Sequence, residues 1–85
     1  MLVSQEMLSV QPAPTELETR IGDAIAVAFR YSGYVQLRDL NVRVDGHEVI
    51  LHGRVPSYYL KQIAHHVALA VPGVNSILDA IDVVS

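Results

Sequence analysis

The chain has 85 residues, a formal net charge of −3, a hydrophobic fraction of 51% and only 6% aromatic residues. That length suffices for one domain, and the composition is that of a folded globular chain whose core is built from Val, Ile, Leu and Ala. The acidic balance disfavours nucleic acid as a partner, because phosphate backbones reward clustered Lys and Arg. The absence of cysteine excludes disulfides and thiolate metal sites.

The first 14 residues end in Gln11-Pro-Ala-Pro14 and are predicted to form a flexible N-terminal arm, so that the domain spans residues 15–85. The alternative for this arm is that its apolar residues dock on a sheet edge. The arm lacks the basic opening of a secretory signal, and no stretch has the roughly 18 apolar residues of a membrane span. We therefore expect a cytoplasmic protein as the sequence is written, or a periplasmic one if the chain is a processed or truncated form.

A first helix is predicted to begin at Thr15. Thr15-Glu-Leu-Glu18 has the spacing of a capping box, in which the Thr hydroxyl and the Glu carboxylate both accept from backbone amides. Ser32-Gly33 ends this helix, because glycine suits the left-handed position just past a helix end. Apolar residues at steps of three and four predict one buried stripe. The stripe comprises Leu17, Ile21, Ala24, Ile25, Ala28 and Phe29.

The apolar period changes to two from residue 40 onward, which predicts a strand with one buried face. Asp45-Gly46 is a strong hairpin signal, because a type I′ turn needs positive φ at both central positions. The return strand covers residues 48–55, and Gly53 falls on its buried face. A missing side chain there predicts either a helix packed closely on the strand or a bulge. The buried face comprises Leu40, Val42, Val44, Val49, Leu51 and Val55.

A second helix follows, with Ser57 as its cap and Pro72-Gly73 as its end. Its apolar stripe comprises Leu60, Ile63, Ala64, Val67, Ala68 and Val71. The last segment, residues 75–84, alternates as a strand through Ile77, Asp79, Ile81 and Val83. The order α-β-β-α-β predicts a single α+β domain with two helices packed on one face of a three-stranded mixed sheet.

The hairpin and the elements after it resemble the BON domain family, named for bacterial osmotic-shock and nodulation proteins. The resemblance is carried by Val42-x-Val44-x-Gly46-x-x-Val49-x-Leu51-x-Gly53-x-Val55, then by Pro72-Gly73-Val74 and Ile81-x-Val83. It covers about Glu16 to Val84, and it departs at Asp79, where the family commonly has Asn. The resemblance implies helices on one side of a three-stranded sheet, no catalytic residues, and a role in phospholipid or membrane attachment within envelope stress responses.

The four histidines are the most obvious chemical groups, but their spacing does not predict a metal site. His65 and His66 are adjacent and point about 100° apart on a helix, whereas a helical metal site needs positions i and i+4. His47 falls at the hairpin turn and His52 on the outer face of the sheet. Ser57 is explained as a helix cap, and no glycine-rich phosphate motif occurs. We predict no catalytic, cofactor-binding or metal-binding residues and no enzymatic activity.

The sequence predicts two surfaces for a partner. Asn41, Arg43, Ile50, His52 and Arg54 should line the sheet face without helices, and Tyr34, Tyr58 and Tyr59 fall near element ends, where tyrosine suits wet interfaces. The simpler interpretation is that two of the four tyrosines seal the core edges. We predict a non-catalytic binding module acting by protein–protein or self-association through the open sheet face. The alternative is peripheral phospholipid attachment; nucleic acid is not expected.

Overall fold

The computed structural model describes residues 14–84, so the expected arm, residues 1–14, lies outside the described residues except for Pro14. The predicted order of two helices and three strands is confirmed, with one short 3-10 helix added before the hairpin. The elements are α2 (Glu16–Arg30), η1 (Val35–Asp39), β1 (Asn41–Asp45), β2 (Glu48–Val55), α3 (Tyr58–Leu69) and β3 (Ser76–Val83).

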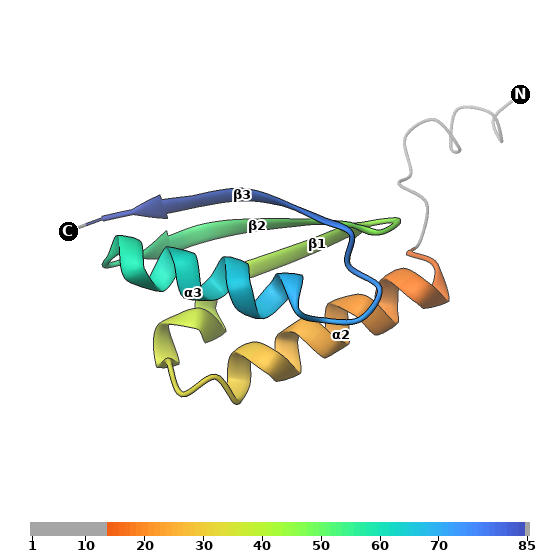
Figure 1. Cartoon of the computed structure of the whole chain (residues 1–85), viewed down its shortest axis with the longest axis horizontal. Coiled ribbons are helices and arrows are strands. Elements are labelled where there is room, and N and C mark those ends of the chain that lie inside the picture. Colours follow the sequence, from red (N-terminus) through yellow and green to blue (C-terminus); the bar gives the residue numbers. More distant parts are fainter. Residues whose placement is uncertain (1–13, 85) are drawn as a thin grey trace, which may run out of the picture.

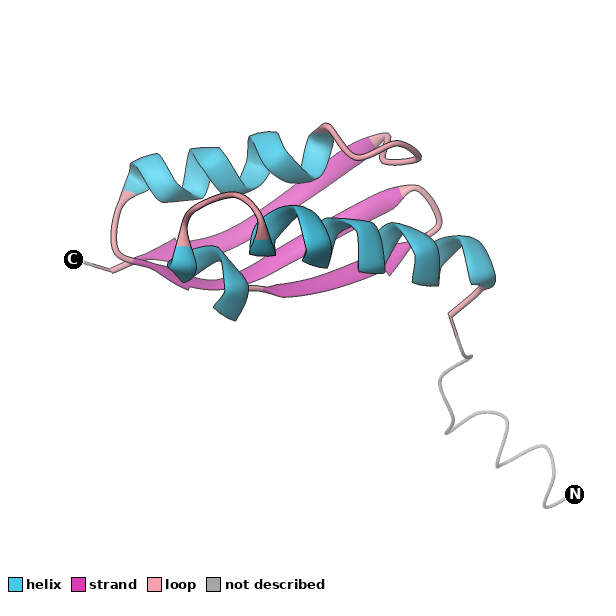
Figure 2. Cartoon of the chain, turned by 90° about the horizontal axis from the view of Figure 1, so that it is seen from below, coloured by secondary structure: helices cyan, strands magenta, loops and turns pink. Residues whose placement is uncertain are grey.

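The three strands form one mixed sheet in the order β1-β2-β3. β1 runs antiparallel to β2, and β2 runs parallel to β3. Both helices lie on the same side of this sheet, as Figure 1 shows from the side and Figure 2 from below. The predicted α+β architecture is therefore confirmed, and within residues 14–84 one face of the sheet has no helix on it.

The hydrophobic core lies between the sheet and the helices. On the sheet side the predicted alternation is confirmed, because Leu40, Val49, Leu51 and Ile81 are buried while Val42 and Val44 pack against them. The helices contribute Ile21, Ile25, Phe29, Leu60, Ala64 and Ala68. Two residues of the predicted α2 stripe, Leu17 and Ala24, are instead exposed. The buried line follows four-residue steps, so Ala24 lies on its flank, and Leu17 belongs to the first turn.

Gly53 has a different neighbour from the helix that we expected. A Cβ at this position would lie 3.0 Å from Cδ2 of Leu40, and the Gly53 backbone has φ +136°, a conformation that L side chains rarely adopt. β2 stays in continuous register with β3 through Gly53 and Ile81, so no bulge explains the glycine. The residue is required because the side chain just before β1 folds over the end of β2.

The η1 helix supplies a core residue for which the sequence made no prediction. Leu37 is fully buried, and η1 contacts α2, β2 and α3. The chain enters this segment through Ser32, whose hydroxyl donates to the Phe29 carbonyl at 2.7 Å and accepts from the Tyr34 amide at 3.2 Å. The connection between α2 and β1 is thus a packed part of the core.

The capping box at the start of α2 is confirmed and also ties the helix to the hairpin. The Thr15 hydroxyl accepts from the Glu18 amide at 3.1 Å, and Glu18 Oε1 accepts from the Thr15 amide at 2.8 Å. The other carboxylate oxygen of Glu18 accepts from the Gly46 amide at 2.7 Å. These bonds lower the pKa of Glu18 below its ordinary value of 4.5, the Gly46 amide having the largest effect and the Thr15 amide the next.

Replacement of Glu18 by glutamine is expected to reduce the acid sensitivity of the fold. A lowered pKa means that the charged carboxylate stabilises the folded state above pH 4.5, and that this stability is lost as the pH falls through the folded-state pKa. Thermal unfolding measured from acidic to neutral pH should show a flatter profile for Glu18→Gln than for the control Glu16→Gln, which leaves the hairpin bond intact. Parallel profiles for the two variants would contradict this role.

Candidate functional site

The helix-free face of the sheet brings together the strand residues predicted as a partner surface. Arg43 lies opposite Ile50 and Asn41 opposite His52 in the antiparallel register, and Arg54 follows on the same side of β2. β3 adds three residues that we did not predict, because Leu78, Ala80 and Asp82 lie opposite Ile50, His52 and Arg54. We call this surface the open face: Asn41, Arg43, Ile50, His52, Arg54, Leu78, Ala80 and Asp82.

The open face has an apolar centre and a polar border. Ile50 is half-buried, and its neighbours Leu78 and Ala80 are exposed, Leu78 by 54%. Side chains of both charge signs surround them, and Arg54 and Asp82 lie directly across from each other. Protein–protein interfaces commonly have such a central apolar patch ringed by polar groups. The alternation of Ile77, Asp79 and Ile81 already implied that the intervening β3 residues face outward.

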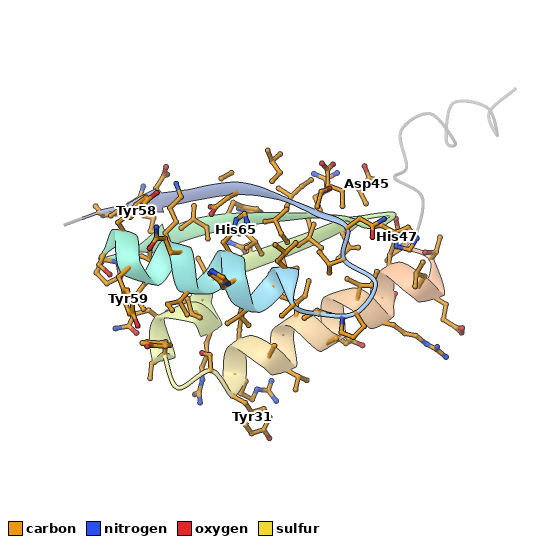
Figure 3. The ribbon with its side chains drawn as sticks, in the orientation of Figure 1. Tyr31, Asp45, His47, Tyr58, Tyr59 and His65 are labelled. Carbon is orange, nitrogen blue, oxygen red and sulfur yellow. The ribbon has the colours of Figure 1, made fainter. Side chains whose placement is uncertain are left out.

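The tyrosines form a second surface where α3 begins. The Tyr34 and Tyr59 hydroxyls are 3.2 Å apart, and their rings meet edge to face with centroids 6.2 Å apart. This hydrogen bond raises the pKa of Tyr34 above 10.0. Tyr34 packs against the core, whereas Tyr31, Tyr58 and Tyr59 are exposed, so one tyrosine rather than two helps to close the core edge. We call Tyr34, Val35, Tyr58 and Tyr59 the tyrosine end; Tyr31 lies apart from it, at the end of α2 (Figure 3).

The predicted site residues therefore fall on two surfaces, as the sequence indicated. Arg43, Ile50, His52 and Arg54 lie on the open face, and the three predicted tyrosines lie at the tyrosine end. The two surfaces approach each other at Arg54, because β2 ends at Val55 and α3 starts at Tyr58. Figure 3 shows Tyr58 and Tyr59 at this end of α3, on opposite sides of the helix in this view.

The histidines make polar contacts that sequence spacing did not reveal. His65 Nδ1 lies 3.4 Å from Asp79 Oδ2. Both residues line a hollow of about 390 Å³ between α3 and β3. Asp79 Oδ1 also accepts from the Ile81 amide at 3.2 Å, and His47 Nδ1 lies 2.8 Å from the Gly73 carbonyl oxygen. Within residues 14–84 no three metal-ligating side chains come together. The same part of the chain has no helix both long and apolar enough to span a bilayer.

The family comparison agrees with the architecture. The model of the BON domain matches residues 15–85, and the chain therefore belongs to the BON domain family. BON domains are a non-catalytic family, and membership is consistent with a binding or membrane-associated module. No curated protein matches the chain.

Proposed function

We propose that this protein is a BON-type binding module that acts by protein–protein association, including self-association, through the open face. The observation that supports the proposal is the apolar centre formed by Ile50, Leu78 and Ala80 within a border of mixed charge. An exposed apolar patch with such a border marks an interaction site more often than an incidental surface. Arg43 and His52 lie on this border, where they are available to orient a partner.

The self-association form of this proposal is tested by reversing charge on the border of the open face. Amide chemical shifts of Arg43, Ile50, His52 and Leu78 should change with protein concentration between about 20 µM and about 1 mM, the range that reports weak association. Arg43→Glu with His52→Glu should abolish these changes, because like charges then face each other across the contact. Both residues are exposed, so the fold should persist.

A matched control distinguishes the effect of placing these charges on the open face from the effect of changing the total charge. Thr19→Glu with Arg20→Glu gives the same change in formal charge on the exposed side of α2. This control should keep the concentration-dependent shifts on the open face. Equal loss in both double variants, or shifts that do not depend on concentration in the unaltered protein, would argue against association through the open face.

The second candidate function is peripheral attachment to phospholipid, and the tyrosine end is the observation that favours it. Exposed aromatic side chains lie there close to Lys61, which shares a hollow with Tyr58. Aromatic and basic residues together suit the headgroup region of an anionic membrane. Co-sedimentation with phosphatidylglycerol-containing vesicles at low salt is expected under this function, and Lys61→Glu should reduce it. Absence of binding to both anionic and zwitterionic vesicles would exclude it.

A further inference from the structure

The apolar exposure of the molecule is concentrated at the tyrosine end. Of the four most exposed large apolar or aromatic side chains of residues 14–84, three belong to it: Val35 at 67%, Tyr58 at 62% and Tyr59 at 57%. The fourth, Tyr31 at 80%, lies apart from them at the end of α2 (Figure 3). The end of β3 reaches the same region, because the Val84 amide donates to the Val55 carbonyl at 2.9 Å. Tyrosine is enriched at protein interfaces, and single scattered apolar residues would not produce such a cluster.

The same end carries most of the positive charge. Arg30 lies in the last turn of α2, Arg38 lies in η1, Arg54 is near the end of β2, and Lys61 lies one turn into α3. Three acidic residues, Asp39, Asp79 and Asp82, accompany these four basic side chains, and Asp79 lines the hollow that Tyr58 and Lys61 share. Arginine and tyrosine together are the residues that most often anchor protein contacts.

The opposite end of the molecule is acidic. The Gly46–Glu18 hydrogen bond holds the start of α2 against the hairpin turn, so the carboxylates of Glu16 and Glu18 lie near those of Asp45 and Glu48. Two basic side chains accompany them: Arg20, which is 3.8 Å from Glu16, and Arg43, which lies two residues before Asp45 in β1. Figure 3 places Asp45 and His47 at one end of the molecule and Tyr58 and Tyr59 at the other. We call Glu16, Glu18, Asp45 and Glu48 the hairpin end.

We propose that the tyrosine end of one copy binds the hairpin end of a second copy, so that the domain associates head to tail. Because the two ends differ in charge and shape, the contact is heterologous. A pair of molecules therefore keeps one free tyrosine end and one free hairpin end. Further copies can bind to these ends until a ring closes or an open chain forms. This inference goes beyond the proposed function, because it adds a second contact for self-association on a different surface from the open face.

The charge distribution favours a second copy over a membrane as the occupant. The chain has a net charge of −3, which disfavours an anionic membrane as its partner. Asp39 and Asp82 lie among the cations of the tyrosine end, where a flat anionic surface would meet them and a shaped protein surface need not. The hairpin end offers carboxylates on a compact projecting turn, which is the complement of exposed cations beside aromatic rings.

Two neutralising double variants test the contact in the full chain. Tyr58→Ser with Lys61→Gln alters the tyrosine end, and Glu16→Gln with Glu48→Gln alters the hairpin end; all four sites avoid the Tyr34–Tyr59 and Glu18–Gly46 bonds. In sedimentation velocity the unaltered protein should form species larger than a dimer at low salt. Its association constant should fall by about tenfold or more between about 0.02 M and about 0.5 M salt, because the contact is charged and exposed.

Mixing the two double variants gives the decisive result. With Arg43→Glu and His52→Glu added, so that the open face cannot contribute, each variant alone should be monomeric, because it retains only one working end. An equimolar mixture should form a species of twice the monomer mass and nothing larger, since the tyrosine end of the hairpin variant still matches the hairpin end of the tyrosine variant. The open-face variant Arg43→Glu with His52→Glu should still form the larger species, which distinguishes failure of this contact from failure of the open face.

Three results would overturn the head-to-tail contact. One is a mixture that stays monomeric while each variant melts as a folded protein. Another is a single variant that associates like the unaltered protein, which would indicate an isologous contact elsewhere. The third combines two observations: the unaltered protein stays monomeric up to about 1 mM at low salt and co-sediments with anionic vesicles, whereas Tyr58→Ser with Lys61→Gln abolishes the co-sedimentation. The tyrosine end would then contact a membrane.

Discussion

Replacement of Leu37 by alanine is expected to lower the free energy of unfolding by about 3 kcal/mol, within the range of about 2–5 kcal/mol measured for buried leucines. The Leu37 side chain is fully buried, and η1 places it against α2, β2 and α3. Its removal therefore leaves a cavity where three elements meet. The backbone on either side is fixed by the start of β1 and the end of α2, which limits how far the site can collapse.

Urea unfolding of Leu37→Ala measures this loss, with Val35→Ala as the matched control from the same short helix. Val35 is largely exposed, so its replacement should change the unfolding free energy by less than about 0.5 kcal/mol. A small and equal effect for the two variants would mean that η1 does not contribute to the core. A large effect for Leu37 alone identifies η1 as part of the folding unit.

The second large effect is expected at Gly53, where valine should destabilise the fold by about 2–4 kcal/mol. Two costs combine: strain from a side chain at φ +136°, and overlap between the new Cβ and Cδ2 of Leu40 at 3.0 Å. A Gly53→Val variant that melts at the temperature of the unaltered protein would contradict this account of the close approach.

Gly22→Ala is the control for Gly53, because it adds a Cβ at a site without either cost. Gly22 lies within α2, and the new carbon would meet Cγ2 of Val44 at 3.6 Å, an ordinary contact. Alanine should stabilise the helix there by about 0.5–1 kcal/mol. Thermal unfolding should therefore show a loss of stability for Gly53→Val and a gain for Gly22→Ala. That result would show that the local backbone geometry, and not the number of glycines, determines the change in stability.

The features predicted correctly from the sequence are those that depend on near neighbours in the chain. Thr15 and Glu18 are three residues apart, and their reciprocal hydrogen bonds form as the capping-box spacing predicts. The alternation in the hairpin fixed which side chains face the helices, because a strand places successive residues on opposite sides. The open-face positions of Arg43 and His52 follow from the same alternation.

The features that escaped prediction depend on contacts between distant segments. Leu37 belongs to a short 3-10 helix that shows no hydrophobic period, so its burial follows only from the packing of α2 against the hairpin. Tyr34 and Tyr59 are 25 residues apart, and nothing local indicates that their hydroxyls meet. Gly53 was an intermediate case: its close approach was predicted, but its neighbour was not. Continuing the hairpin register one step beyond Asn41 and His52 would have identified Leu40.

Asp79 affects how readily the exposed edge of β3 can pair with a strand of another molecule. The Val84 amide points toward β2, and because amides alternate along a strand, that of Ile81 points away from the sheet, at the outer border of β3. The Asp79 carboxylate already occupies this amide. A foreign strand that pairs with β3 must first displace this charged group from the Ile81 amide, which protects the sheet edge against fibril-like stacking.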